Sequence, residues 1–547
     1  MKQIILSILS IVILTSAGCS EKNSEPFTPV PPKVISQSGT EYTLPCSDIV
    51  KVSADELNSE YSSSFCKKIG RDLSDETLNS VWFGENVYGI GLASIVYFNK
   101  YASELDENEW KALSEIALYP EKYGENSSFS EVSFSIYSEY SSRIQNSAYF
   151  DAMTEQIVRD MITQKNYTRQ QAFEILYSRG VTIESCLSDE IQKTVDSVYS
   201  DNSNFTCENQ KVFPQSACVV MDYSGNVLAV AGGNNGNNAY NRAYRTYYSI
   251  GSTVKPLSVY TPAIENNIIT FSGLVDDEPV NINGSLWPSN YDDKYEGKIT
   301  ATYALRQSKN TVPVKLLDTI GIENSFDFLK NRLHFSSLTD DDCNVSSMAM
   351  GYFTKGVSLT ELASSYQMFG NGGIYYNPKF YKRVLDSDGE VIIESENVSE
   401  KIINSDDAWI MNRMLFYNVE MPDGLGFSAK LDNGSEAIGK TGTVDNESGA
   451  DTDKLFVGGT PEYLSAVWVG FDSRGSSIND IKYNSPSLIW KNIMEKISEK
   501  NQKFEPDKSV AEIEYCKKTG QRASEKCPET ETGYYKPDTV PSKCSIH

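Results

Sequence analysis

The residues of this sequence that could do chemistry begin with Ser252 and Lys255, three positions apart. Proline is tolerated only in the first turn of a helix, so Pro256 places a helix start within a residue or so of Ser252. Side chains at positions i and i+3 share one helical face, and an oxyanion formed beside the serine would be stabilised by the helix dipole. A neutral lysine can take the hydroxyl proton if burial and a nearby cation lower its pKa from about 10.4 by about two to three units. The spacing therefore predicts a nucleophilic serine with a lysine base.

Two further motifs follow, Ser308-Lys309-Asn310 and Lys440-Thr441-Gly442-Thr443. Each is weak by itself, because Ser and Asn are typical of polar turns and a Lys-Thr-Gly triplet occurs by chance in roughly one chain of this length in ten. Ser64 and Lys67 repeat the Ser-x-x-Lys spacing, and we interpret them as a solvated surface. Ser-x-x-Lys, Ser-x-Asn and Lys-Thr-Gly in this order form the motif set of penicillin-binding proteins and class A β-lactamases.

Composition excludes several other kinds of protein. The chain has 547 residues, and only two of them, His334 and His547, are histidines. A three-histidine zinc site, an HExxH helix or a two-metal nuclease therefore disagrees with the sequence, and a serine enzyme here needs a base other than histidine. The net charge of −25 argues against a nucleic-acid partner. No cofactor and no metal site is predicted, since no cysteine spacing matches a CxxC zinc signature.

The start of the chain reads as an export signal. A short positive segment, Met1–Gln3, precedes an apolar run, Ile4–Thr15, that is too short for a comfortable bilayer span. Ser16-Ala17-Gly18-Cys19 resembles a bacterial lipobox, in which the cysteine thiol takes a diacylglyceryl group; ordinary secretion and an uncleaved anchor are the alternatives. We predict that residues 1–19 are a lipoprotein signal peptide and that lipidated Cys19 holds an extracytoplasmic protein on the bacterial cell membrane.

A proline-rich segment, residues 20–45, follows and predicts an extended tether. Export to an oxidising compartment favours disulfides among the ten cysteines, with at least one thiol left over besides Cys19. The pairs that would close short loops are Cys46 with Cys66, Cys186 with Cys207, and two of Cys516, Cys527 and Cys544.

The elements that must position the motifs are strands at both ends of a segment with helices between them. The sequence pattern predicts helices from about residue 75 to 118. Four strands are predicted later in the chain, with a hairpin turn between the first two: Cys218–Met221, Val227–Val230, Leu455–Gly458 and Ala466–Val469. A terminal helix follows, whose apolar face carries Ile489, Ile493 and Ile497. This order predicts one α+β domain whose sheet is closed by both ends of its segment.

The chain resembles a class A penicillin-binding protein of peptidoglycan synthesis over most of residues 75–547. Besides the three motifs, the likeness rests on Asn241-Arg242-Ala243, Asn371-Gly372-Gly373, Val467–Asp472 and the tail from Cys516 to His547. The resemblance implies a multidomain α+β fold, in which a transpeptidase domain with an antiparallel sheet flanked by helices follows a small helical glycosyltransferase-like remnant. The expected segments are the remnant, a linker region, the transpeptidase domain and a cysteine-containing tail, at residues 46–125, 126–210, 211–503 and 504–547.

The resemblance also implies catalytic roles. Ser252 would attack the carbonyl of the penultimate D-alanine of a stem peptide, form an acyl-enzyme and expel the last D-alanine, with Lys255 as its base. Ser308 would relay a proton to the leaving amine. Asn310 would hold the substrate amide and Lys255 in place.

The third motif would supply charge and substrate contacts. The resemblance implies that Lys440 helps to keep Lys255 neutral, and that the hydroxyls of Thr441 and Thr443 bind the terminal carboxylate in a substrate-binding segment that includes Gly442. The backbone N–H groups of Ser252 and Thr443 would form the oxyanion hole.

The front region resembles only part of the family's glycosyltransferase domain. Trp82–Ile90 with Tyr97-Phe98, Leu105–Glu109 and Leu118-Tyr119-Pro120 are similar to its C-terminal half. The catalytic half carries Glu-Asp-x-x-Phe and His-x-Gly signatures, yet no histidine occurs before His334. Asp75 stands roughly where the family carries a second glutamate and does not replace that signature. We predict a remnant that does not polymerise glycan.

Three functions are compatible with these observations. The leading one is a D,D-transpeptidase that joins a D-Ala-D-Ala donor to an amine acceptor and is inhibited by β-lactams, with a separate glycan polymerase as a partner. A D,D-carboxypeptidase or β-lactam hydrolase would use the same acyl-enzyme, but no acidic residue can be assigned as a deacylating base by spacing. A non-catalytic penicillin-binding scaffold is the third, and the complete motifs argue against it.

Overall fold

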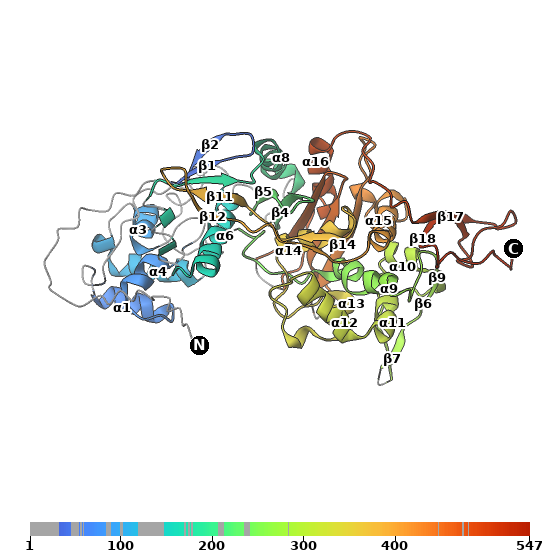
Figure 1. Cartoon of the computed structure of the whole chain (residues 1–547). Helices are drawn as coiled ribbons and strands as arrows, with labels where there is room; N and C mark the ends of the chain where they lie inside the picture. Colours follow the sequence, from blue (N-terminus) through green and yellow to red (C-terminus); the bar gives the residue numbers. More distant parts are fainter. Residues whose placement is uncertain are drawn as a thin grey trace, which may run out of the picture.

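The computed structural model describes residues 32–44, 54–118, 147–205, 213–234 and 241–547, with short gaps within 54–118, 147–205 and 241–547. A small helical lobe from the N-terminal part of the chain lies beside a larger body of sheet and helices (Figure 1). Each has its own apolar core. Leu57 to Ile116 supply the core of the small lobe, and the core of the large body runs from Val34 to Tyr535.

A five-stranded antiparallel sheet forms the centre of the large body, in the order β14-β15-β16-β4-β5. The first two strands of the predicted α+β segment and its last three meet here, so both ends of the segment close the sheet, as its sequence predicts. The five strands are β4 (Gln215–Asp222), β5 (Val227–Ala231), β14 (Ile438–Asp445), β15 (Asp451–Gly459) and β16 (Tyr463–Gly470).

Both faces of this sheet are covered, which explains its continuous apolar strands. Side chains alternate along a strand, and in β4 Val219 joins the core on one face while Cys218 and Val220 join the core on the other. Helices α8 (Asp189–Ser200) and α16 (Pro486–Ile497) cover the second face, and the predicted apolar stripe of α16 packs into that core. Helix α14 (Leu359–Tyr366) covers the first face, and α15 (Ser405–Glu420) packs against β14.

A second sheet corrects one prediction. Residues 33–43 were expected in an extended tether, but they form β1 (Lys33–Ile35) and β2 (Glu41–Thr43) in a sheet of order β12-β11-β3-β1-β2. The reason is non-local: Val34 is fully buried, and β1 pairs in parallel with a strand almost 150 residues later. The remaining strands of this sheet are β3 (Thr182–Ser185), β11 (Tyr381–Leu385) and β12 (Val391–Glu394).

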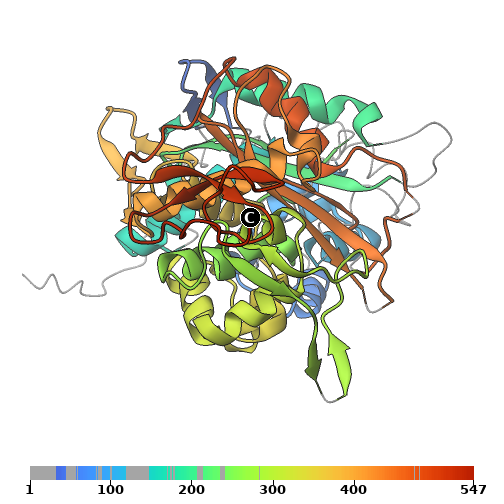
Figure 2. The ribbon, with the colours of Figure 1, turned by 90° about the vertical axis from the view of Figure 1, so that its right-hand side faces the viewer.

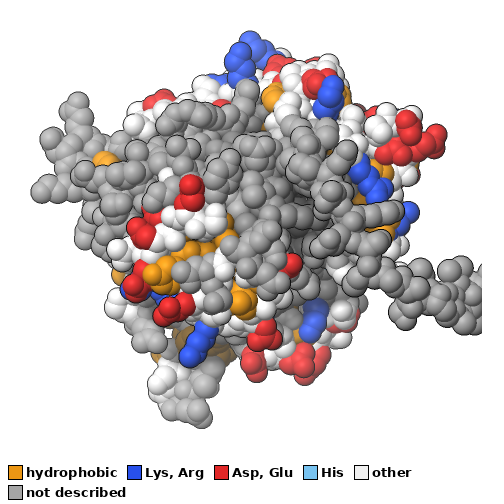
Figure 3. All heavy atoms as spheres, turned by 90° about the vertical axis from the view of Figure 1, so that its left-hand side faces the viewer, with side chains coloured by type: hydrophobic (Ala, Val, Ile, Leu, Met, Phe, Trp, Pro, Cys, Tyr) orange, Lys and Arg blue, Asp and Glu red, His pale blue; other side chains and the backbone are white. Residues whose placement is uncertain are grey.

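The small lobe is helical, and Phe65, Phe83 and Trp110 meet at its centre, with ring centroids 5.7–6.1 Å apart. Its helices are α1 (Ser59–Lys68), α2 (Asp75–Ser80), α3 (Ile90–Phe98) and α4 (Glu107–Leu118). On the described surface in Figure 3, acidic and basic side chains are interspersed. None of the helices in the described ranges has both the length and the apolar composition of a membrane span.

The remaining elements surround the sheets and connect the motifs. The hairpin of β7 and β8 projects from the body (Figures 1 and 2). The elements not yet named are α6 (Ser147–Lys165), α9 (Thr261–Glu265), β6 (Leu274–Asp277), β7 (Val280–Ile282), β8 (Ser285–Trp287), β9 (Gly297–Thr300), α10 (Ala301–Arg306), α11 (Thr311–Ile320), α12 (Ile322–Asp327), α13 (Val345–Met350), β10 (Ile374–Tyr376), β13 (Ser399–Lys401), β17 (Ala511–Cys516) and β18 (Thr530–Tyr535).

The cysteines do not follow the expected disulfide pattern. All three tail cysteines are free thiols, so the pair predicted among them is wrong. Cys66 and Cys186 are also free, and their expected partners Cys46 and Cys207 lie outside the described residues, as does Cys19.

Candidate active site

The first motif starts a helix where the sequence predicts one. A helical turn over Gly251–Val254 begins one residue before Ser252, continues through Pro256–Tyr260 and runs into α9. Lys255 is fully buried, whereas Ser252 is partly exposed. The Ser252 hydroxyl has no hydrogen bond within the described part of the chain. Hydrogen bonds of a catalytic group often tighten only when the substrate is bound.

Backbone contact between this helix and β14 places Ser252 beside the third motif. Gly251 has a φ of +54°, and a Cβ there would lie 2.3 Å from the carbonyl oxygen of Thr443. A Cβ on Gly442 would lie 2.5 Å from the carbonyl oxygen of Ile250. Two glycines thus allow the start of the helix and the strand to touch without side chains between them.

We expect Gly251→Ala to lower the free energy of unfolding by about 1–3 kcal/mol more than Gly389→Ala does, because the strand must move away from the new methyl group. Chemical denaturation measures the loss. Gly389→Ala is the matched control, since Gly389 also has a positive φ but no atom within 4 Å of its Cβ position. Equal losses in the two variants would contradict the close contact as the cause.

Lys255 is held by the second motif. Its Nζ donates hydrogen bonds to Asn310 Oδ1 at 2.6 Å and to the Ser308 carbonyl oxygen at 2.8 Å, and it lies 3.4 Å from Ser308 Oγ. These acceptors favour the ammonium form, but burial and then the charge of Lys440 hold the pKa of Lys255 well below its ordinary value. The amine therefore gives up its proton far more readily than an exposed lysine, which is the condition for a base.

Lys440 approaches the same hydroxyl from β14. It is fully buried, and its Nζ donates to Ser308 Oγ at 2.9 Å and to the Thr441 carbonyl oxygen at 3.1 Å. Burial lowers the pKa of Lys440 to about 7. The Ser308 hydroxyl thus lies between two buried amines, and a proton can pass through it.

The remaining residues of the third motif line the more accessible side of β14. Side chains alternate along a strand, so Thr441 and Thr443 share one face and Lys440 lies on the other. Thr443 is exposed and Thr441 is partly exposed, while Gly442 is buried against the helix start. The two hydroxyls are accessible to a ligand approaching from solvent.

One cluster that positions the site was missed from the sequence. Lys309, the middle residue of the second motif, is 1% exposed and its Nζ lies 3.2 Å from Asp277 and 2.9 Å from Glu296. Asp277 is fully buried and also accepts a hydrogen bond from Asn290, whose Oδ1 accepts the backbone N–H of Asn310 at 2.8 Å. This cluster holds the turn in which Ser308 adopts a φ of +51°.

Removing the charge of Asp277 should destabilise the fold. We expect Asp277→Asn to lower the free energy of unfolding by about 3 kcal/mol, because the buried Lys309 ammonium loses an ionic partner. Denaturant unfolding followed by fluorescence measures this. In the control, Asp276→Asn, the carboxylate is 41% exposed and paired with Lys315, so about 0–1 kcal/mol is expected. A loss as small as that of the control would argue against the buried pair.

A cavity of about 720 Å³ adjoins the far end of β14. Its lining includes Val444 and Asp445, directly after Thr443, together with Tyr248, Phe353 and Trp468. None of the residues predicted for catalysis lines it. His334 is also outside the site; its Nε2 lies 3.4 Å from Glu400.

Comparison with known families and proteins agrees with this geometry. Residues 216–495 match the family model of the penicillin binding protein transpeptidase domain, and residues 75–137 match the transglycosylase family. Penicillin-binding protein 1A of Clostridium botulinum is 30% identical over 488 residues, covering 78% of this chain and 57% of that protein. Penicillin-binding protein 1F of Bacillus subtilis is 28% identical over 472 residues, covering 81% and 64%. The chain spans somewhat more than half the length of these relatives.

Solved structures share the fold. PonA1 from Mycobacterium tuberculosis superposes with a TM-score of 0.55 at 22% identity, covering 65% of this chain and 95% of that one. Penicillin-Binding Protein 1A from Haemophilus influenzae gives a TM-score of 0.61 at 17% identity, covering 95% and 99%. With its three motifs gathered around one hydroxyl and a truncated transglycosylase region in front, this chain belongs to the class A penicillin-binding proteins.

Proposed function

We propose that this protein is a serine D,D-transpeptidase that cross-links peptidoglycan stem peptides through an acyl-enzyme at Ser252 and is inhibited by β-lactams. One observation carries the proposal. The Ser308 hydroxyl lies between the buried amines of Lys255 and Lys440, and Lys255 lies one helical turn after Ser252. A structural role alone does not require two lysines in a desolvated site, because burying an amine costs free energy.

In the proposed reaction, neutral Lys255 takes the hydroxyl proton of Ser252 as Oγ attacks the carbonyl carbon of the penultimate D-alanine. The backbone N–H groups of Ser252 and Thr443 stabilise the oxyanion. The C–N bond then breaks. The Ser308 hydroxyl, which lies between Lys255 and Lys440, passes the proton taken up by Lys255 to the amine of the terminal D-alanine, which leaves. An acceptor amine attacks the resulting ester, loses its proton to the same base and restores the serine.

Substrate recognition is assigned to the accessible face of β14. The hydroxyls of Thr441 and Thr443 bind the terminal carboxylate, and Asn310 holds the substrate amide. A β-lactam presents a strained amide and a carboxylate to the same groups and acylates Ser252. PonA1 of Mycobacterium tuberculosis, which shares the fold, has been solved in complex with penicillin V, and this supports β-lactam binding here.

The test incubates the purified protein with fluorescent penicillin, and separately with a donor stem peptide and an amine acceptor. We expect a stable covalent adduct and an amine-linked product in the native protein and neither in Ser252→Ala. Ser64→Ala is the matched control, because Ser64 has the same spacing to Lys67 but both are exposed on α1. An adduct with D-alanine release but no amine product would identify a carboxypeptidase or hydrolase, and no adduct would identify a scaffold.

We also propose that the front region lacks glycosyltransferase activity and that a separate polymerase supplies the glycan. The sequence has no histidine before His334, and Asp75 has a structural role, since its Oδ1 accepts the backbone N–H of Ala54 at 2.7 Å. Incubation with lipid-linked disaccharide should give no polymer. Polymer formed by the purified native protein would overturn this proposal.

Finally, we propose an extracytoplasmic protein anchored by a lipid at Cys19. The support is the short apolar run before a small-residue segment that ends in cysteine. Fractionation of cells should find the native protein and Cys343→Ala in the membrane and Cys19→Ala released. Retention of Cys19→Ala on the membrane would contradict the lipid anchor.

A further inference from the structure

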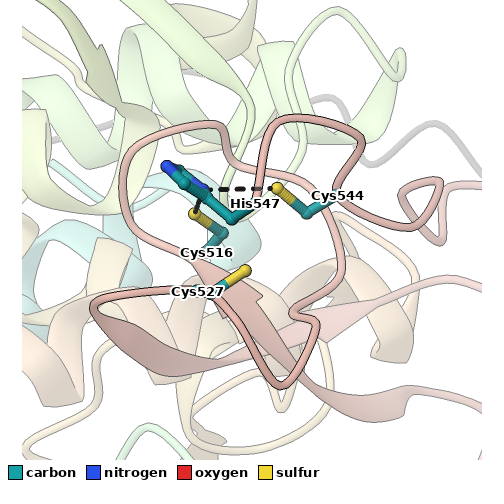
Figure 4. Close-up of side chains that lie close together, drawn as sticks. All are labelled: Cys516, Cys527, Cys544 and His547. Carbon is teal, nitrogen blue, oxygen red and sulfur yellow. Dashed lines mark hydrogen bonds between the residues drawn. The ribbon is translucent and has the colours of Figure 1, made fainter.

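Four side chains with metal-ligand chemistry meet in the C-terminal tail. They are Cys516 at the end of β17, Cys527 in the loop before β18, and Cys544 and His547 in the last segment. One ligand atom of each lies within 4.8 Å of all the others. Figure 4 shows the three sulfurs and the ring converging on a common point, with the ring nitrogen directed at two of the sulfurs. Their separations along the chain match no CxxC pattern, so the sequence did not predict this cluster.

The distances fit a tetrahedral zinc ion. With a Zn–S distance of about 2.3 Å and a Zn–N distance of about 2.0–2.1 Å, a sulfur and a nitrogen ligand are about 3.6 Å apart. His547 Nδ1 lies 3.4 Å from Cys516 Sγ and 3.6 Å from Cys544 Sγ. A disulfide would instead bring two sulfurs to about 2.05 Å, and all three thiols are free.

Neighbouring groups support the cluster as outer hydrogen-bond donors to thiolate ligands do in metal sites. The backbone N–H of Ser524 donates to Cys527 Sγ at 3.2 Å, and the hydroxyl of Thr519 donates to Cys544 Sγ at 3.5 Å. Ser524 Oγ also donates to the His547 carbonyl oxygen at 2.9 Å. Cys516 and Cys544 are buried, while the other two ligands are partly exposed.

We propose that Cys516, Cys527, Cys544 and His547 bind one Zn²⁺ ion in a closed structural site. Three thiolates and one neutral imidazole fill the four positions that structural zinc sites use and leave none for a substrate. Binding releases the three thiol protons and leaves the centre with a net charge of −1. Soft sulfur ligands with imidazole select zinc over magnesium or calcium.

The site has a clear structural purpose. Strands β17 and β18 pack into the core of the large body through Tyr515, Tyr534 and Tyr535, whereas no residue of 517–529 or 541–547 belongs to that core. A metal ion bound to the end of β17, the following loop and the last segment would fasten all three together. Figure 2 shows this tail in front of the body, facing the viewer.

The C-terminal tail contacts the large body close to the second motif. Ser272, between α9 and β6, donates to the Gly520 carbonyl oxygen at 2.6 Å and accepts a hydrogen bond from Tyr535 at 2.7 Å. Arg306, the last residue of α10 and two residues before Ser308, lies 3.0 Å from Glu531 of β18. The zinc site therefore stabilises the tail that contacts the end of α10. This helix leads directly to the second motif.

The test begins with the full chain, purified without a histidine tag under reducing conditions. Mass spectrometry of metals should find about one zinc ion per chain in the native protein and less than about a tenth of a zinc ion per chain in Cys516→Ser and Cys544→Ser. The control is Cys343→Ser, which removes a free thiol outside the cluster and should keep about one zinc ion per chain. Loading with Co²⁺ should give the absorption of a tetrahedral thiolate complex. A strong chelator should lower the melting temperature of the native protein and leave that of Cys544→Ser unchanged.

Three results would overturn the proposal. One is the absence of zinc after the reduced native protein is incubated with Zn²⁺, a measurement that does not depend on any variant folding. Another is an intact mass and peptide map showing that two tail cysteines form a disulfide in the purified native protein. The third is undiminished zinc in both cysteine variants.

Discussion

Lys255→Met is expected to reduce the second-order rate constant for acylation by penicillin about 10⁴-fold, the upper range for loss of a general base. Methionine keeps most of the length of the buried side chain but has no amine to accept the hydroxyl proton of Ser252. The lysine is fully buried, and burial and the charge of Lys440 hold its pKa well below the ordinary value, so the amine gives up its proton more readily than an exposed lysine, as the proposed base must. Stopped-flow fluorescence with labelled penicillin measures the rate constant.

The surface lysine with the same spacing provides the control. Lys67→Met removes an exposed amine three residues after Ser64 and should leave the acylation rate unchanged. Melting curves of both variants separate a lost base from a lost fold. A folded Lys255→Met protein that is acylated within about tenfold of the native rate would show that another group takes the proton.

Sequence reasoning succeeded where the relevant interactions are local. Pro256 fixes the helix start by the geometry of its own ring, so the positions of Ser252 and Lys255 on one helical turn follow from neighbouring residues. The strands β4 and β5 and the hairpin turn between them follow from neighbouring residues in the same way. These patterns survive folding because they depend on few distant partners.

The features that were missed depend on distant partners. Lys309 stands at an unspecified position of its motif, and its role appears only when Asp277 is folded against it. Residues 33–43 have the composition of a tether, and the parallel pairing of β1 with β3 could not be read from that composition. The tail ligands are likewise brought together by β17–β18 pairing and by the return of the last segment, where Cys544 N–H donates to the Arg522 carbonyl oxygen at 2.8 Å.

Lys440→Met is expected to lower the acylation rate constant at neutral pH about 10³-fold and to shift the rising part of its pH profile to higher pH. In the proposed mechanism acylation requires neutral Lys255, so the rate should rise as pH passes through the pKa of that amine. The positive charge of Lys440 lowers this pKa, and its removal must therefore raise it. The effect should be largest below about pH 7, where Lys440 itself is protonated.

Two further variants make the explanation specific. Lys440→Arg keeps a cation near Ser308, so its pH profile should shift less than that of Lys440→Met even if the hydrogen bond of 2.9 Å is lost. Lys430→Met removes a half-exposed amine paired with Glu420 and should not change the profile. A rising limb that stays in place or moves to lower pH in Lys440→Met would mean that Lys440 acts on the substrate alone. In that case burial, without the second amine, would be the sole cause of the basicity of Lys255.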